Sequence, residues 1–306
     1  RVAVQCPAPG CSRLGDRGMS SSWEAPGDCA VGWLAGHIAE AVVSRNFETA
    51  SSIFTLPNPD GSWMADPFLL PEYNGRYVLV EEFRKATAKG IISLIDLETV
   101  KGSTKPTTVL EEPFHLSFPF VFNYLGSTYM CPETADAREV RLYRNLGSPG
   151  NWRFEHTLLK DVRAVDSLIF QRENLWWLLT TMDSTNMGDL STELHAFFAE
   201  NPLSQVWTPH ALNPIVDNSS AGRNAGLLQD NHETIRLAQI QTPSAYGAGL
   251  KFMRINRLSP TSYEEEEITS LSASDFEDMR GLHHLTTYGG RTLIDVNLSS
   301  PNGSMK

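Results

Sequence analysis

Residues 66–83 read DPFLLPEYNGRYVLVEEF: an apolar run, a turn that carries Asn and Gly, and a second run rich in β-branched and aromatic residues. This order is typical of a β-hairpin. Four later stretches repeat it: SFPFVFNYLGSTYMCPE (117–133), AVDSLIFQRENLWWLLTT (164–181), RNAGLLQDNHETIRLAQI (223–240) and LHHLTTYGGRTLIDV (282–296). A hairpin that recurs about every 50 to 60 residues, with further strands between its copies, is typical of propeller blades. The sequence therefore predicts an all-β fold, a five-bladed β-propeller.

The first four hairpins are each followed by two more strand-like stretches. These are GIISLIDL (90–97) and TTVLEE (107–112), EVRLYRNL (139–146) and WRFEHTLL (152–159), ELHAFFAE (193–200) and WTPHAL (207–212), and GLKFMRINRL (249–258) and YEEEEI (263–268). For the fifth unit, we expect the upstream stretch SSIFTL (51–56) to complete the blade, because closing the ring removes a free sheet edge. The expected organisation is an irregular N-terminal segment at 1–45 and a single propeller domain at 46–306. One weak helical pattern, GWLAGHIAEAVV (32–43), falls within the N-terminal segment.

Composition and charge restrict the partners. The chain has 306 residues, of which 41% are hydrophobic, and a net charge of −11. An acidic surface repels phosphate backbones, so we expect no nucleic-acid partner. No run of about 18 apolar residues occurs, so we expect no membrane-spanning segment. The sequence leaves the oligomeric state open.

The four cysteines bear on the compartment. Cys6, Cys11 and Cys29 lie in the N-terminal segment, whereas Cys131 stands apart. A disulfide among the first three would fit an oxidising compartment, and free thiols would fit equally well. We expect a secreted protein or one in the lumen of the secretory pathway, with a cytoplasmic location as the alternative.

The candidate site residues lie where the first strand of each unit begins. In a propeller the innermost strand of each blade lines a central funnel, and here the first strand is the most apolar of its unit. Polar side chains at the same phase of the five units are therefore expected to converge. They are Asp66, His115, Ser117, Asp166, Arg223, Asn224, His283 and His284, to which we add Glu133 at the end of MCPE and Gln239 and Gln241 in the fourth hairpin.

Converging carboxylates favour glycosidic chemistry, in which one acts as base or nucleophile, one as acid, and a third orients the acid or tunes its pKa. We therefore predict that Asp66, Asp166 and Glu133 are catalytic. The other candidates would bind hydroxyl or anionic groups of a small-molecule or glycan substrate. Adjacent His283 and His284 would point to opposite faces of a strand, so we predict no metal site. No glycine-rich phosphate loop opens a helix, and we expect no cofactor.

Six strings carry a family resemblance: ADPFLL (65–70), EEPFHLSFPFVFNYLGSTYMCPE (111–133), VRLYRN (140–145), VDSLIF (165–170), WTPHALNPI (207–215) and GRNAGLL (222–228). They resemble the N-terminal domain of the plant glucosamine inositolphosphorylceramide transferases and of its bacterial and fungal relatives, over roughly residues 60–296. The resemblance implies a five-bladed propeller akin to the arabinanase, xylosidase and invertase glycosidases. In those enzymes an Asp on the first blade and an Asp on the third are catalytic, which matches Asp66 and Asp166 by position. Their acid Glu has no secure match, and Glu133 is the candidate.

Two features depart from this family. The plant proteins carry their sugar-transferring domain separately, at the C-terminal side, so the resemblance implies no glycosyl transfer for this region. The relatives tend to carry Gln-Asp-Cys where this chain has Gln239-Ile240-Gln241, and often an acidic residue at the position of Ile91. Both changes favour a more apolar site.

Three hypotheses for function follow. The first is a carbohydrate-active propeller enzyme with glycoside-hydrolase-like acid/base chemistry. The second is an enzyme of fungal-type secondary metabolism that catalyses dehydration or cyclisation, a hetero-Diels–Alder reaction included, of an apolar molecule; it predicts a funnel lined by aromatic side chains with few acids. The third is a non-catalytic binding scaffold, which predicts a filled funnel.

Overall fold

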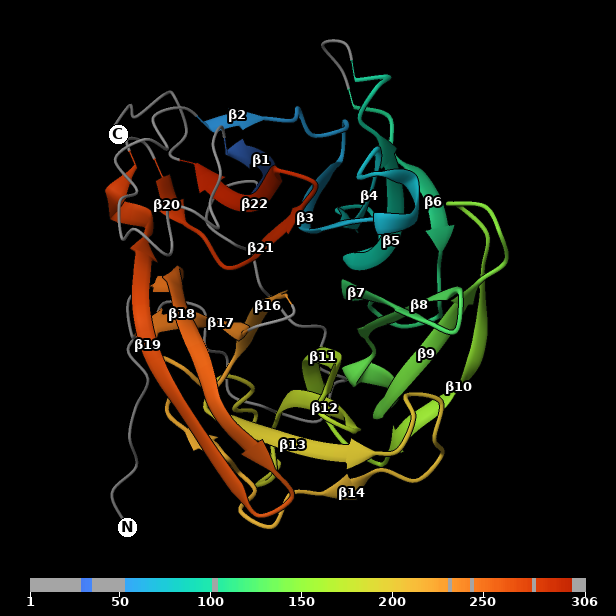
Figure 1. Cartoon of the computed structure of the whole chain (residues 1–306). Helices are drawn as coiled ribbons and strands as arrows, with labels where there is room; N and C mark the ends of the chain where they lie inside the picture. The colour runs from blue at the N-terminus through green and yellow to red at the C-terminus, as the bar shows by residue number, and fades with distance from the viewer. Residues whose placement is uncertain are drawn as a thin grey trace.

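The computed structural model describes residues 29–34, 53–100, 104–230, 233–242, 245–276 and 279–298. Their strands form five antiparallel sheets arranged as blades around a common axis (Figure 1). The prediction of an all-β, five-bladed propeller is confirmed. The helical elements of these ranges are three single 3₁₀ turns, η1 (Pro71–Tyr73), η2 (Ala135–Ala137) and η3 (Ala273–Asp275). Within the described ranges, no helix has the length and apolar character needed to span a membrane.

Blades 1 to 4 each run from the innermost strand outward along the chain. Blade 1 contains β3 (Ser62–Leu69), β4 (Tyr77–Arg84), β5 (Lys89–Asp96) and β6 (Thr107–Leu110). Blade 2 contains β7 (Ser117–Tyr124), β8 (Ser127–Glu133), β9 (Glu139–Asn145) and β10 (Trp152–Lys160). Blade 3 contains β11 (Ala164–Arg172), β12 (Leu175–Met182), β13 (Glu193–Ala199), β14 (Thr208–Pro209) and β15 (Val216–Asp217), which also pairs with β13. Blade 4 contains β16 (Asn224–Gln229), β17 (Thr234–Thr242), β18 (Ala245–Ser259) and β19 (Ser262–Ser272).

The inner hairpins turn at the residues that the sequence pattern singles out. Between β3 and β4, Asn74 and Gly75 adopt left-handed backbone conformations, with φ of 53° and 66°. Between β7 and β8, Leu125 and Gly126 have φ of 48° and 72°. Two successive positive φ values match the right-handed twist of the strands that a short turn joins. The predicted hairpins of blades 1 and 2 are therefore confirmed together with these turns.

Blade 5 joins the two ends of the described chain. Its inner strand β21 (Leu285–Tyr288) pairs with β22 (Arg291–Leu298), β22 pairs with β1 (Cys29–Leu34), and β1 pairs with β2 (Ile53–Thr55). A short strand, β20 (Met279–Gly281), also pairs with the end of β22. β2, which lies within the stretch expected to complete this blade, is its outermost strand.

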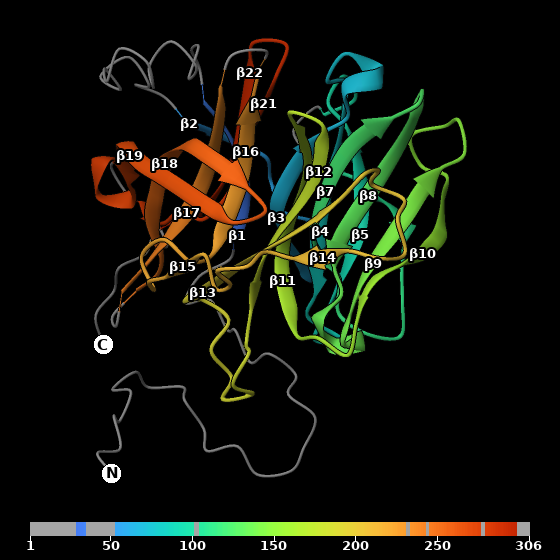
Figure 2. The ribbon, with the colours of Figure 1, turned by 60° about the horizontal axis from the view of Figure 1, so that its bottom comes forward.

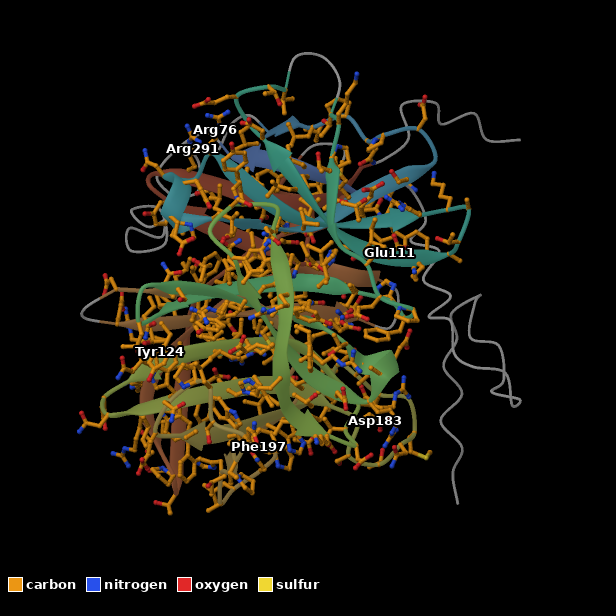
Figure 3. All side chains as sticks on the ribbon, turned by 90° about the vertical axis from the view of Figure 1, so that its right-hand side faces the viewer. Arg76, Glu111, Tyr124, Asp183, Phe197 and Arg291 are labelled. Carbon is orange, nitrogen blue, oxygen red and sulfur yellow. The ribbon has the colours of Figure 1, made fainter. Side chains whose placement is uncertain are left out.

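The prediction that residues 1–45 are irregular is wrong at residues 29–34. CAVGWL forms β1, the third strand of blade 5, because its backbone fills the space between β22 and β2. Of the weak helical pattern at 32–43, the first three residues belong to this strand, and the rest lies outside the described residues. Arg291 also donates a hydrogen bond to the carbonyl of Gly75 at 2.7 Å, which ties blade 5 to blade 1, and Figure 3 shows Arg291 beside Arg76 at this junction.

Apolar side chains pack between neighbouring blades. Trp176 of blade 3 lies 5.7 Å from the ring of Phe122 and 5.4 Å from that of Tyr124, both in blade 2. Phe68 of blade 1 meets Phe118 of blade 2 edge to face at 5.0 Å. These contacts make the ring one packed body, with blades 2 and 4 on opposite sides of it (Figure 2).

The cysteine predictions are tested only in part. Cys131 is a buried thiol in β8 with no disulfide, and burial raises its pKa to about 12. Cys29 is buried at the start of β1. Cys6 and Cys11 lie outside the described residues, so the pairing among the N-terminal cysteines stays a prediction.

Candidate functional site

The inner strands of blades 1, 2 and 3 carry a β-bulge at the same point. The bulge places Asp66, Phe118 and Asp166 in the left-handed backbone region, with φ of 48°, 43° and 50°. Such conformations are uncommon for residues other than glycine and persist only where the surroundings hold them. Asp66 therefore sits inside the strand rather than before it, with 5% of its surface exposed. The bulge turns its carboxylate toward the neighbouring blades.

The second strands of blades 1, 2 and 5 each add a carboxyl group near the inner strand. Glu81 of β4 pairs with Ala65, and Glu133 of β8 pairs with Ser117. In blade 5, the N–H of Asp295 in β22 donates a hydrogen bond to the carbonyl oxygen of His284. We call Asp66, Glu81, Glu133, Asp166 and Asp295 the acid cluster, and they come from four blades. Burial, with repulsion among them, raises the pKa of Asp66 and of Glu81.

His283 lies between two members of the acid cluster. Its Nε2 is 3.0 Å from Asp295 Oδ2 and 3.6 Å from Asp66 Oδ1. Burial alone would lower the pKa of His283, but the two carboxylates raise it to about 9. Burial raises the pKa of Asp66 to about 7, against the opposing attraction of His283 and the N–H of Phe118. His283 is therefore an imidazolium at neutral pH.

Asp295 is the ionised member of this group. It accepts hydrogen bonds from the backbone N–H groups of His283 and His284, at 3.0 and 2.9 Å, and from that of Asp66 at 3.4 Å. Burial would raise its pKa, yet His283 and these donors lower the pKa below its usual value. Hydrogen bonds donated to a buried carboxylate favour its charged form.

Among the described residues, Asp66, His283 and Asp295 form a group that could bind a metal ion, since one ligand atom from each lies within 4.8 Å of the other two. In this structure His283 pairs with both carboxyl groups, and we call the three residues the ion triad. The sequence argument was that His283 and His284 point in different directions, and they do. That argument did not consider the carboxyl groups that lie beside His283.

Asp166 is held by blade 4. Its Oδ2 accepts hydrogen bonds from Arg223 Nε at 2.5 Å and from Gln239 Nε2 at 3.1 Å. Arg223 also approaches Glu133, with 3.9 Å between Arg223 Nη2 and Glu133 Oε2. Burial, with repulsion from Asp166, raises the pKa of Glu133 to about 8, although Arg223 and the hydroxyl of Ser117 oppose this. The raised pKa values allow Asp66 and Glu133 to carry a proton at neutral pH. Next to them, Asp166 pairs with Arg223 and Asp295 pairs with His283.

Asn224 is a structural residue rather than a contact for substrate. It is fully buried and donates to the carbonyl oxygens of Asp166 and Leu179, at 2.8 and 3.1 Å. Its own side-chain oxygen accepts from Arg236, which forms a two-pronged ion pair with Glu265. This buried chain of contacts fixes the bulge that presents Asp166.

Glu81 is held by His115 from blade 2. His115 Nε2 lies 3.4 Å from Glu81 Oε1, while Nδ1 accepts the N–H of Gly90 at 3.0 Å. An imidazole that accepts at Nδ1 donates at Nε2 and is neutral. Burial lowers the pKa of His115, and burial together with repulsion from Asp66 and Glu133 raises that of Glu81 well above its ordinary value.

The structure thus gathers most of the predicted site residues and separates a few. Asp66, Asp166, Glu133, His115, Ser117, Arg223, Gln239 and His283 meet around the acid cluster, and Gln241 donates to Gln239 at 2.8 Å from just outside it. His284 is fully buried against Phe68 and Phe118 and bonds the carbonyl of Pro67, so it packs the core. Burial lowers its pKa to about 4. Ile91 is fully buried in β5, and Ile240 is half-buried.

Sequence reasoning missed Glu81 and Asp295. Each is a carboxylate within an apolar second strand, in VLVEEF and TLIDV. Glu133 occupies the corresponding place in MCPE and was chosen for that reason. Had the same phase been read in all five second strands, it would have identified all three.

Solvent still reaches several of these groups. The side chains of His115, Glu133, His283 and Arg223 retain 18%, 14%, 13% and 12% exposure. The other members of the acid cluster lie deeper, with Asp66 and Glu81 at 7%. His115, Glu133, His283 and Arg223 therefore form the solvent-facing side of the acid cluster.

The fold is that of propeller glycoside hydrolases. It matches a family 117 glycoside hydrolase of the marine bacterium Zobellia galactanivorans with a TM-score of 0.52 and 12% identity, over 79% of this chain and 88% of that one. It also matches an exo-1,5-alpha-L-arabinanase from a bovine ruminal metagenomic library with a TM-score of 0.50 and 12% identity, over 78% of this chain and 95% of that one. At this identity the likeness concerns the fold.

Sequence comparisons identify the family to which the chain belongs. Residues 38–283 match the family described as the N-terminal domain of glucosamine inositolphosphorylceramide transferase 1, and the chain belongs to this family. It is 35% identical over 229 residues to the Arabidopsis thaliana protein of that name, covering 72% of this chain and 29% of the relative. It is 31% identical over 232 residues to the protein from Oryza sativa subsp. japonica, covering 72% of this chain and 31% of the relative. The chain thus spans about a third of the length of these relatives.

Proposed function

We propose that the acid cluster binds a small glycan or glycoconjugate and cleaves a glycosidic bond by acid/base catalysis. The observation that carries the proposal is the geometry: carboxyl groups of blades 1, 2 and 3 converge, Arg223 contacts both Glu133 and Asp166, and burial raises the pKa of Glu133 to about 8. Carboxyl groups kept in different protonation states are the requirement of glycoside hydrolysis. The likeness in fold to glycoside hydrolases supports the same proposal.

Each group has a role in this proposal. Glu133 gives its proton to the glycosidic oxygen as the bond to the anomeric carbon breaks and its electron pair passes to that oxygen. Water attacks the anomeric carbon and gives a proton to Asp66, and the proton returns to Glu133 through solvent, so each cycle consumes one water. Asp166, anchored by Arg223 and Gln239, faces the anomeric carbon and stabilises the positive charge that develops there.

The cyclase alternative fits less well. It requires an apolar lining with few acids, whereas five carboxyl groups gather at this site, and Phe68 and Phe118 lie buried behind it. The scaffold alternative predicts no turnover of any glycoside, which the experiment below tests.

The test is turnover of a panel of 4-nitrophenyl glycosides by the native sequence and by Asp66→Asn, Glu133→Gln and Asp166→Asn. Each variant is expected to lose at least about 100-fold in kcat/KM, because acid/base groups contribute that much or more. Glu82→Gln is the matched control, since Glu82 bonds Ser93 at 2.6 Å outside the cluster. Equal turnover by the native chain and all three cluster variants would contradict the proposal, as would an absence of both turnover and glycan binding.

A further inference from the structure

The start of β7 supplies a separate donor to each of three carboxyl groups. His115 Nε2–H faces Glu81 at 3.4 Å, the hydroxyl of Ser117 bonds Glu133, and the N–H of Phe118 bonds Asp66 Oδ2 at 3.1 Å. These donors lie within four consecutive residues. One short segment therefore fixes the orientation of carboxyl groups from blades 1 and 2 at once.

Glu81 differs from the rest of the acid cluster in its charge partners. Asp166 and Glu133 face Arg223, and Asp66 and Asp295 face His283. The groups that act most strongly on Glu81 are, by contrast, four carboxyls, Asp66, Glu133, Asp295 and Asp166. Its ion-pair partner in the described structure is His115, which is neutral because Nδ1 accepts the N–H of Gly90. A buried carboxyl group without a cation keeps its proton.

Gly90 shows that this contact is built into the fold. A Cβ atom there would lie 2.5 Å from the carbonyl oxygen of Leu116, 2.7 Å from Glu81 Oε1 and 2.7 Å from His115 Cε1. The N–H of Leu116 also bonds the carbonyl of Gly90 at 3.0 Å. Only glycine lets β5 approach the start of β7 closely enough for His115 to hold Glu81.

We propose that Glu81 is a positioning residue for Asp66, held by His115 as a neutral carboxylic acid, and that its proton keeps Asp66 able to ionise near neutral pH. The proposal rests on the proposed function, in which Asp66 accepts the proton from water. If Glu81 lost its proton, a further negative charge would lie beside Asp66 in a buried setting and would hold the proton on Asp66. His115 is in turn the positioning residue for Glu81.

The first experiment needs no substrate. The carboxyl carbons of ¹³C-labelled Asp and Glu are followed by NMR from pH 4 to pH 10 in the native sequence, in Glu81→Gln and in the control Glu82→Gln. In the native sequence and the control, the Asp66 signal is expected to titrate in two steps, the upper one coupled to Glu81. In Glu81→Gln the lower step is expected to keep its midpoint and the upper step to disappear, because Gln has the neutral form of Glu81 and no proton to lose. An Asp66 curve that is the same in all three proteins, or a Glu81 signal already that of a carboxylate at pH 6, would overturn the proposal.

The second experiment tests His115. Imidazole ¹⁵N NMR is expected to show a neutral ring protonated at Nε2 at pH 7, and a ring that is cationic or protonated at Nδ1 overturns its positioning role. On any glycoside that the native chain turns over, the upper limb of the pH profile is expected to change in Glu81→Gln and not in Glu82→Gln. Two-step titration without turnover of any glycoside would reject the proposed reaction alone, whereas turnover with one-step titration would reject the role of Glu81 alone.

Discussion

At the scale of the residue, His283 links the charge of the site to the stability of the fold. Its pKa rises from 6.5 to about 9 on folding because Asp295 and Asp66 outweigh burial. A group whose pKa is raised in the folded state stabilises fully below its unfolded pKa and loses that contribution as pH rises through the folded value. We therefore expect the free energy of unfolding to fall between about pH 6.5 and pH 9, with an upper limit of about 3 kcal/mol from this group.

The measurement is denaturant unfolding at intervals from pH 6 to pH 10. Glu133 also contributes stability that is lost as pH rises, between its ordinary pKa of 4.5 and its folded pKa of about 8. The contribution of Glu133 is therefore lost at lower pH than that of His283. His283→Gln is expected to be less stable at pH 6 and to show a flatter dependence above pH 7. A native chain that becomes more stable from pH 7 to pH 9 would contradict the ion triad.

At the scale of the element, the run Glu264–Glu267 in β19 shows how a strand divides like charges between two environments. Glu265 pairs with fully buried Arg236 at 2.7 Å and accepts the hydroxyl of Tyr263, whereas Glu264 pairs with Arg257 where both side chains are more than half exposed. Glu265→Gln is expected to destabilise the fold by about 3 kcal/mol, because it leaves a buried guanidinium without its carboxylate. Glu264→Gln is the matched control and is expected to stay within about 0.5 kcal/mol. Unfolding midpoints of the two variants give the comparison, and equal effects would refute the assignment of faces.

The same element shows what a sequence can reveal. Strand-forming stretches and hairpin turns are local properties, so the five inner hairpins and the strands after them were predictable from apolar runs and from Asn or Gly in the turns. The inward direction of Glu265 was not, because register depends on where Arg236 lies on β17. The sequence pattern did not predict β1 for a similar reason, since CAVGWL is short and its partner β22 lies near the other end of the chain. Among the candidate site residues, the phase of the repeat placed Asp66, Asp166 and Arg223, but the burial of His284 and Asn224 depends on packing between blades.

At the scale of the whole molecule, the ring depends on one short strand from near the start of the chain. Val31 of β1 is fully buried and packs in one core cluster with Met64 of blade 1 and Leu293 of blade 5. Without β1, the outer side of β22 would be a free edge, and blade 5 would lose its third and fourth strands. The closure therefore joins blades 5 and 1 next to the bulge that carries Asp66.

We expect Val31→Asp to unfold the propeller as a unit rather than blade 5 alone. A buried, unpaired carboxylate costs several kcal/mol, and the packed contacts between blades transmit the loss of one seam to the others. Hydrogen exchange is the measurement: the amides of β12, on blade 3, are expected to lose protection together with those of β22. Val206→Asp is the control, because Val206 is 75% exposed, and it should leave both strands protected. Protection retained in β12 while β22 exchanges freely would mean that blades 1 to 4 stand without the closure, and that the ends of the chain shape the acid cluster without supporting the rest of the fold.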